Sequence, residues 1–166
     1  MAGDDEERVL VVTTGGTIDK VYFDAKSDYE VGESLVGDLL RRAQVRLPYD
    51  VLQVLRKDSL DIDDADRARI RAAIAARGET RVLITHGTDT MTDTAAALTG
   101  LAGRTIVLTG SLAPARFAET DALFNVGMAF AAVQILPPGV YIAMNGQVFA
   151  AGNVRKDRRQ NAFVRC

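Results

Sequence analysis

Short runs of β-branched and aliphatic residues alternate along the chain with longer windows of helical periodicity. The first run, Arg8 to Thr13, is continuously apolar after its arginine, which is typical of a strand covered on both faces in a parallel sheet. Similar runs lie at residues 51–55, 81–85, 105–109 and 140–144, and helical windows lie near residues 33–43, 63–77, 91–101 and 119–134. Because strands alternate with helices, we expect a three-layer α/β/α domain with a mainly parallel sheet, and one domain over residues 1–166.

The last helical window carries Leu123, Val126, Phe130 and Val133 at helical spacing, and we expect this stripe to face the core. In an open sheet of the flavodoxin or Rossmann type, ligands bind beyond the carboxyl ends of the strands. The loops that follow the strands are therefore where the chemistry is expected.

Composition narrows the classes of function. The 166 residues include 20 basic and 22 acidic side chains, a net charge of -2, so charge favours neither a nucleic-acid partner nor an acidic membrane. The chain has one histidine, His86, and one cysteine, Cys166, which excludes His-rich or thiolate metal clusters and an internal disulfide. The start, MAGDDEER, is acidic where a signal peptide is basic, and the apolar runs are shorter than the ~20 residues that span a bilayer. We expect a cytoplasmic protein.

The loop after the first strand contains two adjacent glycines, Gly15 and Gly16, followed by Thr17. Glycines allow a sharp turn and let a ligand approach the backbone N–H groups, and the hydroxyl of Thr17 lies just beyond them. Taken alone, this loop also fits a tight strand-to-helix turn in which Thr17 is the cap. A phosphate-binding loop is disfavoured, because neither GxxxxGK[ST] nor GxGxxG occurs in the chain.

A second polar loop follows the strand at 81–85. Thr90 and Asp93 have the spacing of a capping box for the next helix. That explanation assigns no role to Thr88 and Asp89, whose hydroxyl and carboxylate follow the carboxyl end of the strand. His86 has the residue type of a catalytic base, but a lone histidine at a strand end is more often structural.

Together, the segments TGGTI (residues 14–18) and HGTDTM (residues 86–91) resemble the paired signature of the bacterial-type L-asparaginases and glutaminase-asparaginases. The similarity extends over nearly the whole chain from Val9. Residues 26–32 resemble this family's lid, and residues 58–62 resemble the segment that binds the substrate's carboxylate. Residues 110–114 resemble its loop beside the substrate, and residues 144–146 with 153–156 resemble its lysine segment.

The resemblance implies an L-asparaginase that hydrolyses asparagine to aspartate and ammonia through an acyl-enzyme, without a metal or organic cofactor. Thr17 would be the nucleophile, Tyr29 its lid-borne helper, and Thr88, Asp89 and Lys156 a second hydroxyl–carboxylate–amine set for proton transfer. The residues expected to bind substrate are Gly16, Ser59, Gly87, Thr88, Asp89 and Ser111. Without the resemblance, Ser59 is a candidate cap of the helix at 63–77, Tyr29 an ordinary loop tyrosine, and Lys156 part of a solvated charge run.

Two alternatives stay open: a glutaminase or other small-amide hydrolase, because one methylene in a pocket is worth only ~1–3 kcal/mol, and a non-catalytic amino-acid-binding domain. The resemblance covers only the N-terminal domain of the two-domain enzymes, in which a neighbouring subunit closes the site. We therefore expect a homo-oligomer. Candidate contacts outside the expected core stripe are Phe117, Phe124, Met128, Phe149 and Phe163.

Overall fold

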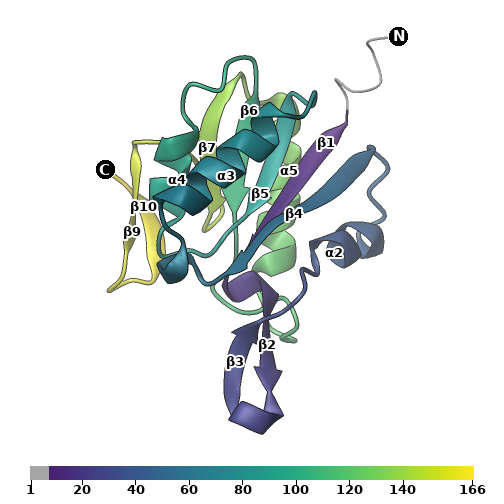
Figure 1. The fold of residues 1–166 in the computed structure, drawn as a ribbon, viewed down its shortest axis with the longest axis vertical. Coiled ribbons are helices and arrows are strands. Elements are labelled where there is room, and N and C mark those ends of the chain that lie inside the picture. The colour runs from purple at the N-terminus through teal and green to yellow at the C-terminus, as the bar shows by residue number, and fades with distance from the viewer. Residues whose placement is uncertain (1–7) are drawn as a thin grey trace.

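The computed structural model describes residues 8–166, and its centre is a six-stranded sheet (Figure 1). The strands are β1 (Val9–Gly15), β4 (Tyr49–Lys57), β5 (Arg81–Thr85), β6 (Thr105–Thr109), β7 (Gly139–Met144) and β8 (Gln147–Ala150). Their order is β4-β1-β5-β6-β7-β8, and all neighbours are parallel except β8, which runs antiparallel to β7. The parallel strands therefore follow the order 2-1-3-4-5, as in flavodoxin-like sheets. The acidic segment 1–7, part of the argument against a signal peptide, lies outside the described residues.

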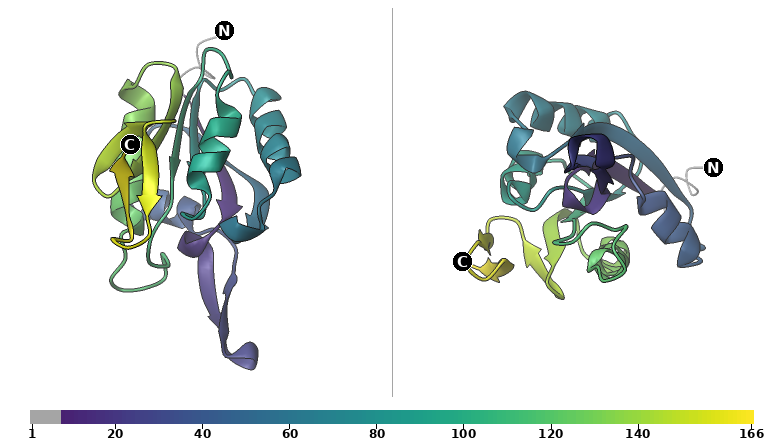
Figure 2. Two further views of the ribbon diagram at one scale, coloured as in Figure 1. Left: turned by 90° about the vertical axis from the view of Figure 1, so that its left-hand side faces the viewer. Right: turned by 90° about the horizontal axis from the view of Figure 1, so that it is seen from below.

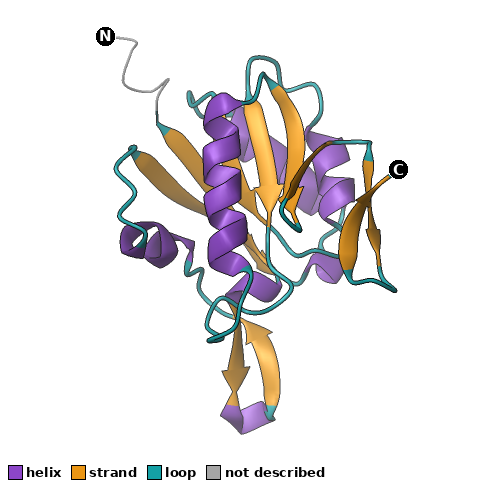
Figure 3. Cartoon of the chain, turned by 180° about the vertical axis from the view of Figure 1, so that it is seen from behind, coloured by secondary structure: helices purple, strands orange, loops and turns teal. Residues whose placement is uncertain are grey.

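Helices cover both faces of the sheet, which confirms the expected three layers. The helices α3 (Asp64–Ala75) and α4 (Met91–Leu98) pack on one face, and α2 (Val36–Arg42) and α5 (Ala122–Ile135) pack on the other (Figures 1 and 3). Alternate side chains of β1 belong to different cores: Leu10 and Val12 face α3 and α4, and Val9 and Val11 face α2 and α5. Within residues 8–166, no helix combines the length and apolarity that a bilayer crossing requires.

The helix α5 faces the core with a different stripe from the expected one. Val126, Phe130 and Val133 are buried as predicted, but Leu123 is 51% exposed, so its assignment to the core was wrong. The sequence of α5, ALFNVGMAFAAVQI, has no charged residue and is apolar on all sides. Periodicity therefore did not distinguish its faces, and the small residue Ala122 packs against the sheet in place of Leu123.

Two antiparallel hairpins outside the six-stranded sheet were not expected from the pattern. One consists of β2 (Lys20–Phe23) and β3 (Asp28–Val31), joined by the 3-10 turn η2 (Asp24–Lys26), and it projects away from the sheet (Figures 1 and 2). The other consists of β9 (Val154–Asp157) and β10 (Ala162–Arg165) and flanks the sheet near α4. Phe149 on β8 and Phe163 on β10 are buried in the core, so they do not supply the interface contact suggested for them. Phe117 and Phe124 remain exposed.

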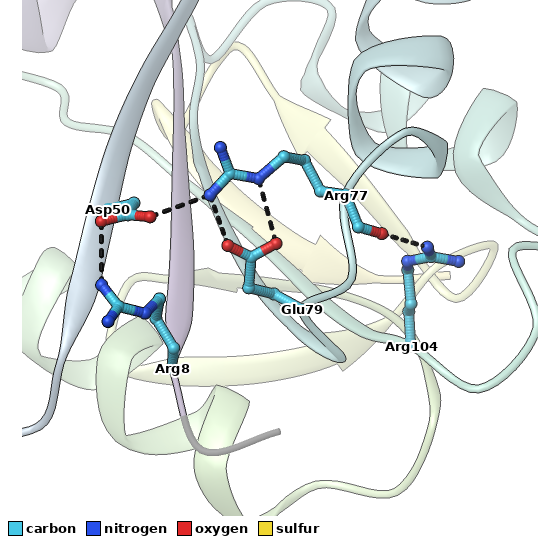
Figure 4. A network of polar contacts seen from close by, with 5 residues as sticks. All are labelled: Arg8, Asp50, Arg77, Glu79 and Arg104. Carbon is cyan, nitrogen blue, oxygen red and sulfur yellow. Dashed lines mark hydrogen bonds and ion pairs between the residues drawn. The ribbon is translucent and has the colours of Figure 1, made fainter. Parts of the chain in front are cut away.

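The amino edge of the sheet is held by a network of ion pairs (Figure 4). Asp50 accepts hydrogen bonds from Arg8 at 3.0 Å and from Arg77 at 2.9 Å. The guanidinium of Arg77 also donates two hydrogen bonds to Glu79, which hold the pKa of Glu79 below its usual range, and Arg104 donates to the backbone carbonyl of Arg77. These residues lie before or at the beginning of β1, β4, β5 and β6. The carboxyl edge is therefore at the opposite end of the sheet.

Candidate active site

The two threonine loops meet at the carboxyl edge of the sheet. Strands β1 and β5 pair in register up to Thr13 and Thr85, so the loops after them begin at the same level. The strand order also reverses between β1 and β5, which is where open α/β sheets bind ligands. A Cβ atom on Gly16 would lie 2.4 Å from the Cα of Gly87, and Gly16 has φ +91°. Only glycine fits this close approach.

Thr17 begins a short 3-10 turn, η1 (Thr17–Asp19), and is half-buried. The residue at its N-cap is Gly16, and no side chain caps the turn, so the interpretation of Thr17 as a cap was wrong. The backbone on either side is fixed: the Gly16 N–H donates to the Lys57 carbonyl at 2.9 Å, and Ala115 donates to the Ile18 carbonyl at 3.0 Å. Thr17 therefore lies on a turn whose backbone is anchored on both sides, and its hydroxyl does not cap that turn.

Thr88, Asp89 and Lys156 lie together at the second loop. The Lys156 Nζ donates to the Thr88 Oγ1 at 2.8 Å and to the Asp89 Oδ1 at 2.9 Å. Lys156 lies on β9, and its side chain is only 13% exposed, so the idea of a solvated charge run does not apply to it. The loop of Thr88 faces the Thr17 loop through the Gly16–Gly87 contact.

Ser59 supports this loop from the side of β4. It begins the 3-10 turn η3 (Ser59–Asp61), is buried, and lies so close that a Cβ on Gly87 would be 2.6 Å from its own Cβ. Its carbonyl accepts a hydrogen bond from the Thr90 hydroxyl at 2.7 Å. Gly87 is therefore enclosed between the turn of Ser59 and Gly16.

Two predicted helix caps were wrong. The Thr90 side chain makes no capping hydrogen bond to α4, because its hydroxyl is used to hold the Ser59 turn, and the predicted capping box with Asp93 does not form. The cap of α3 is Asp63, which forms a capping box with Asp66, so Ser59 is not the cap of that helix.

His86 is a structural residue, as the sequence favoured. It is completely buried, with Nδ1 2.7 Å from the Gly87 carbonyl and Nε2 2.8 Å from the Thr94 hydroxyl. Because a carbonyl only accepts, Nδ1 carries the proton and Nε2 accepts from Thr94. Burial lowers the pKa of His86 to about 4, which keeps the ring neutral at pH 7. Both nitrogens are occupied in holding the loop, so His86 is not placed as a base.

Ser111 is buried in the loop after β6, and its hydroxyl donates to the Ala113 carbonyl of the same loop. Asp121, which sequence reasoning missed, organises this loop: its carboxylate accepts from the backbone N–H groups of Leu112 at 3.0 Å and Ala113 at 3.1 Å. It also accepts from the Asn125 side chain at 2.8 Å. The helical window expected at 119–134 included Asp121, whereas in the structure Asp121 is the N-cap residue of α5.

Tyr29 lies on β3 of the protruding hairpin and is 45% exposed. Its ring packs edge-on against Tyr22 of the same hairpin and against Phe117 of the loop at residues 110–121, at centroid distances of 5.4 Å and 6.0 Å. The hairpin therefore already contacts the loop that follows β6. Within residues 8–166, no group of three or more His, Cys, Asp or Glu side chains is arranged to hold a metal ion.

Comparison with known proteins agrees with this geometry. The family model "Asparaginase, N-terminal" matches residues 8–164. An L-asparaginase of Thermococcus kodakarensis is 31% identical over 161 residues, which cover 90% of this chain and 47% of that protein. The solved structure of the thermostable L-asparaginase from that organism superimposes with a TM-score of 0.79 at 27% identity, covering 95% of this chain and 51% of that one.

Two relatives have other names. A glutaminase-asparaginase of Acinetobacter glutaminasificans is 30% identical over 176 residues, covering 96% of this chain and 53% of that protein. A component of the glutamyl-tRNA(Gln) amidotransferase of Aeropyrum pernix is 30% identical over 161 residues, covering 86% of this chain and 36% of that protein. The chain thus spans about half the length, or less, of these relatives. Since the family model covers nearly all of the described residues, the chain belongs to the asparaginase family and corresponds to its N-terminal domain.

Proposed function

We propose that residues 1–166 form a catalytic domain that hydrolyses L-asparagine to L-aspartate and ammonia through an acyl-enzyme on Thr17. The observation that carries this proposal is the contact of Lys156 with Thr88 and Asp89, set against the loop of Thr17. Membership of the asparaginase family supports the reaction class.

In the first step, the Thr17 hydroxyl attacks the side-chain amide carbon of asparagine, while its proton moves toward the leaving nitrogen. A threonine hydroxyl needs such proton removal to be a useful nucleophile at neutral pH. Tyr29 is the candidate for assisting this step from the lid. Backbone N–H groups of the Thr17 and Thr88 loops are the candidate donors to the oxyanion, and removing one such donor typically costs ~3–4 kcal/mol.

In the second step, the acyl-enzyme is hydrolysed by water. Because Lys156 donates a hydrogen to the Thr88 oxygen, the Thr88 hydroxyl hydrogen is free to point toward a ligand or water. Thr88, Lys156 and Asp89 thereby form a connected path along which a proton can be held or passed. A positioned group of this kind contributes typically ~10²–10⁴-fold.

Residues of the same loops are also the candidates for binding the α-ammonium and α-carboxylate groups of the substrate. Lys156 occupies Oδ1 of Asp89, and the carboxylate is 33% exposed, which leaves it accessible to the substrate's α-ammonium group. Ser59, beside Gly87, is the candidate for the α-carboxylate. Gly16 and Gly87, the two glycines predicted to bind substrate, let the two threonine loops pack closely against each other, and Ser111 is the candidate contact from the third loop.

Glutamine is the second candidate substrate, because one relative is a glutaminase-asparaginase and another is a component of a glutamyl-tRNA(Gln) amidotransferase. The deciding experiment measures ammonia release from asparagine, from glutamine and in buffer alone. We expect release from asparagine to exceed both of the others.

Thr17→Ala tests the mechanism, with Thr99→Ala as a matched control on the exposed end of α4, where the hydroxyl only contacts the Ala96 carbonyl. We expect kcat to fall roughly 10³-fold or more in Thr17→Ala, as for loss of a nucleophile, and to be unchanged in Thr99→Ala. Near-normal turnover by Thr17→Ala contradicts the mechanism. Tight aspartate binding without hydrolysis of any amide favours the non-catalytic binding domain.

A further inference from the structure

Asp19 is a buried carboxylate outside the catalytic set. It closes the η1 turn two residues after Thr17 and is 1% exposed. Within residues 8–166, its Oδ1 has no hydrogen-bond partner. Burying a carboxylate with an unsatisfied oxygen is costly, so its presence calls for a compensating role.

Asp19 lies at the base of the hairpin formed by β2 and β3. The hairpin's first pair joins Lys20 to Val31, and the Gly32 N–H then donates to the Asp19 carbonyl at 2.7 Å. The Ser34 hydroxyl and the backbone N–H of the next residue, at 35, lie beside the Asp19 carboxylate and favour its ionised form. One residue therefore holds the outgoing and the returning ends of the hairpin together.

Two arginines from other elements hold the returning end as well. The Arg56 Nε on β4 donates to the Val31 carbonyl at 2.9 Å, and Arg116 donates to the Glu33 carbonyl at 3.5 Å. These guanidinium groups are the charges that face Asp19, and both favour its ionised form. Burial outweighs the two arginines and the nearby Ser34 hydroxyl, and raises the pKa of Asp19 to about 6.

We propose that Asp19 is a positioning residue, whose carboxylate ties both ends of the hairpin to the turn of Thr17 and so sets how Tyr29 approaches the nucleophile. The inference rests on the proposed function. The ionised carboxylate attracts the donor groups of the returning end and balances Arg56 and Arg116. Its protonation weakens this attraction to the donors and to the two arginines, and so loosens the hairpin.

The test compares Asp19→Asn, which removes the charge but keeps the shape, with Asp24→Asn at the exposed hairpin tip. Hydrogen exchange of residues 20–32 is measured without ligand at pH 7, and kcat and KM for asparagine are measured from pH 5 to 8. In Asp19→Asn we expect roughly tenfold faster exchange, since charged hydrogen bonds are stronger than neutral ones by about this factor. We expect kcat to fall about 10- to 100-fold, as for a misplaced catalytic group.

The pH dependence of kcat distinguishes a positioning role of Asp19 from a role in hairpin stability alone. The wild-type and Asp24→Asn proteins should lose kcat below about pH 6, where Asp19 becomes protonated. The Asp19→Asn protein should lack this inflection. Unchanged exchange and an unchanged profile in Asp19→Asn overturn the proposal. Faster exchange with wild-type kcat and pH profile also overturns it, because Asp19 then serves only hairpin stability.

If Asp19→Asn does not fold, Ser34→Ala decides the question by removing one donor to the carboxylate. We expect hydrogen exchange and kcat to change in the same direction as in Asp19→Asn, but by less. Wild-type values of both overturn the proposal. If the wild-type protein hydrolyses no amide, the proposed function is wrong and the positioning role falls with it. The exchange data then show separately whether Asp19 still holds the hairpin.

Discussion

The Nζ of Lys156 lies 2.8 Å from the Oγ1 of Thr88, although 68 positions separate the two residues in the chain. Thr88 follows β5 near the centre of the sheet, and Lys156 lies on a hairpin that packs beside α4. Because the lysine is mostly buried and also contacts Asp89, its ammonium group is held in one place. This contact is the strongest structural support for the proposed proton path.

Breaking this contact should abolish most of the activity while the fold survives. For Thr88→Val and for Lys156→Met we expect kcat to fall roughly 10³-fold, within the range for loss of a positioned proton-transfer group. Arg158→Met, in the exposed part of the same charge run, is the control and should keep wild-type kcat. Turnover and melting temperature are measured on the same preparations. Wild-type kcat in either site variant contradicts the assigned role.

The hairpin should become ordered when a product is bound. Residues 22–30 are exposed, and Tyr22, Phe23 and Tyr29 present aromatic surface to solvent. Segments with few buried contacts exchange their amide hydrogens readily, and lids close over bound ligands. We expect aspartate to slow hydrogen exchange in residues 19–32 and to leave the amides of α3 unchanged. Equal exchange with and without aspartate argues against a closing lid.

The exposed side of α5 should mediate self-association. Phe124 is 65% exposed and Ile135 is 81% exposed, on a helix with no charged residue. A helix that is apolar on all sides is normally covered. We expect light scattering to show a dimer or larger assembly whose specific activity falls on dilution. Phe124→Ser should weaken this assembly, whereas Leu60→Ser, an equally exposed leucine on η3, should not. A monomer with undiminished activity shows that the domain closes its own site.

His86 should make the protein sensitive to acid. The pKa of His86 is lowered to about 4 in the folded protein, whereas an exposed histidine has a pKa near 6.5. The unfolded chain therefore binds a proton at His86 more readily than the folded protein does. Its contribution to stability is complete above pH 6.5 and is lost as the pH falls through about 4, by up to about 3 kcal/mol.

Urea unfolding of the wild type and of His86→Gln from pH 4 to 7.5 measures this effect. The contribution of Asp19 to stability changes with pH in the opposite direction. Its raised pKa stabilises the folded state toward pH 4, and that contribution disappears as the pH rises through about 6. The Asp19 contribution cancels in the difference between the two proteins. We expect the wild type to gain free energy of unfolding relative to His86→Gln as the pH rises, and a constant difference contradicts the prediction.

Several features followed from the sequence because their causes are local. The buried strands are continuous apolar runs, and their alternation with helices predicted the parallel sheet and the three layers. The glycines at positions 15, 16 and 87 marked the loops in which the backbone approaches other atoms closely. The paired motifs around Thr17 and Thr88 led to the family that the comparisons later confirmed.

Other features depended on tertiary packing. Leu123 and Ala122 are both apolar residues on one helix, and only the contact with the sheet decided which of them is buried. The hydroxyl of Thr90 had a plausible local partner at its own helix end, but the carbonyl of Ser59, which the fold brings within 2.7 Å, took its place.

The proposed catalytic set shows the same division. The sequence by itself determined which side chains are available, namely Thr17, Thr88, Asp89 and Lys156, and the glycines that let their loops approach. The tertiary structure decided that β5 pairs beside β1, and that the β9–β10 hairpin turns Lys156 inward from a charge run. Strand order and hairpin docking depend on contacts between distant segments, which no local periodicity encodes.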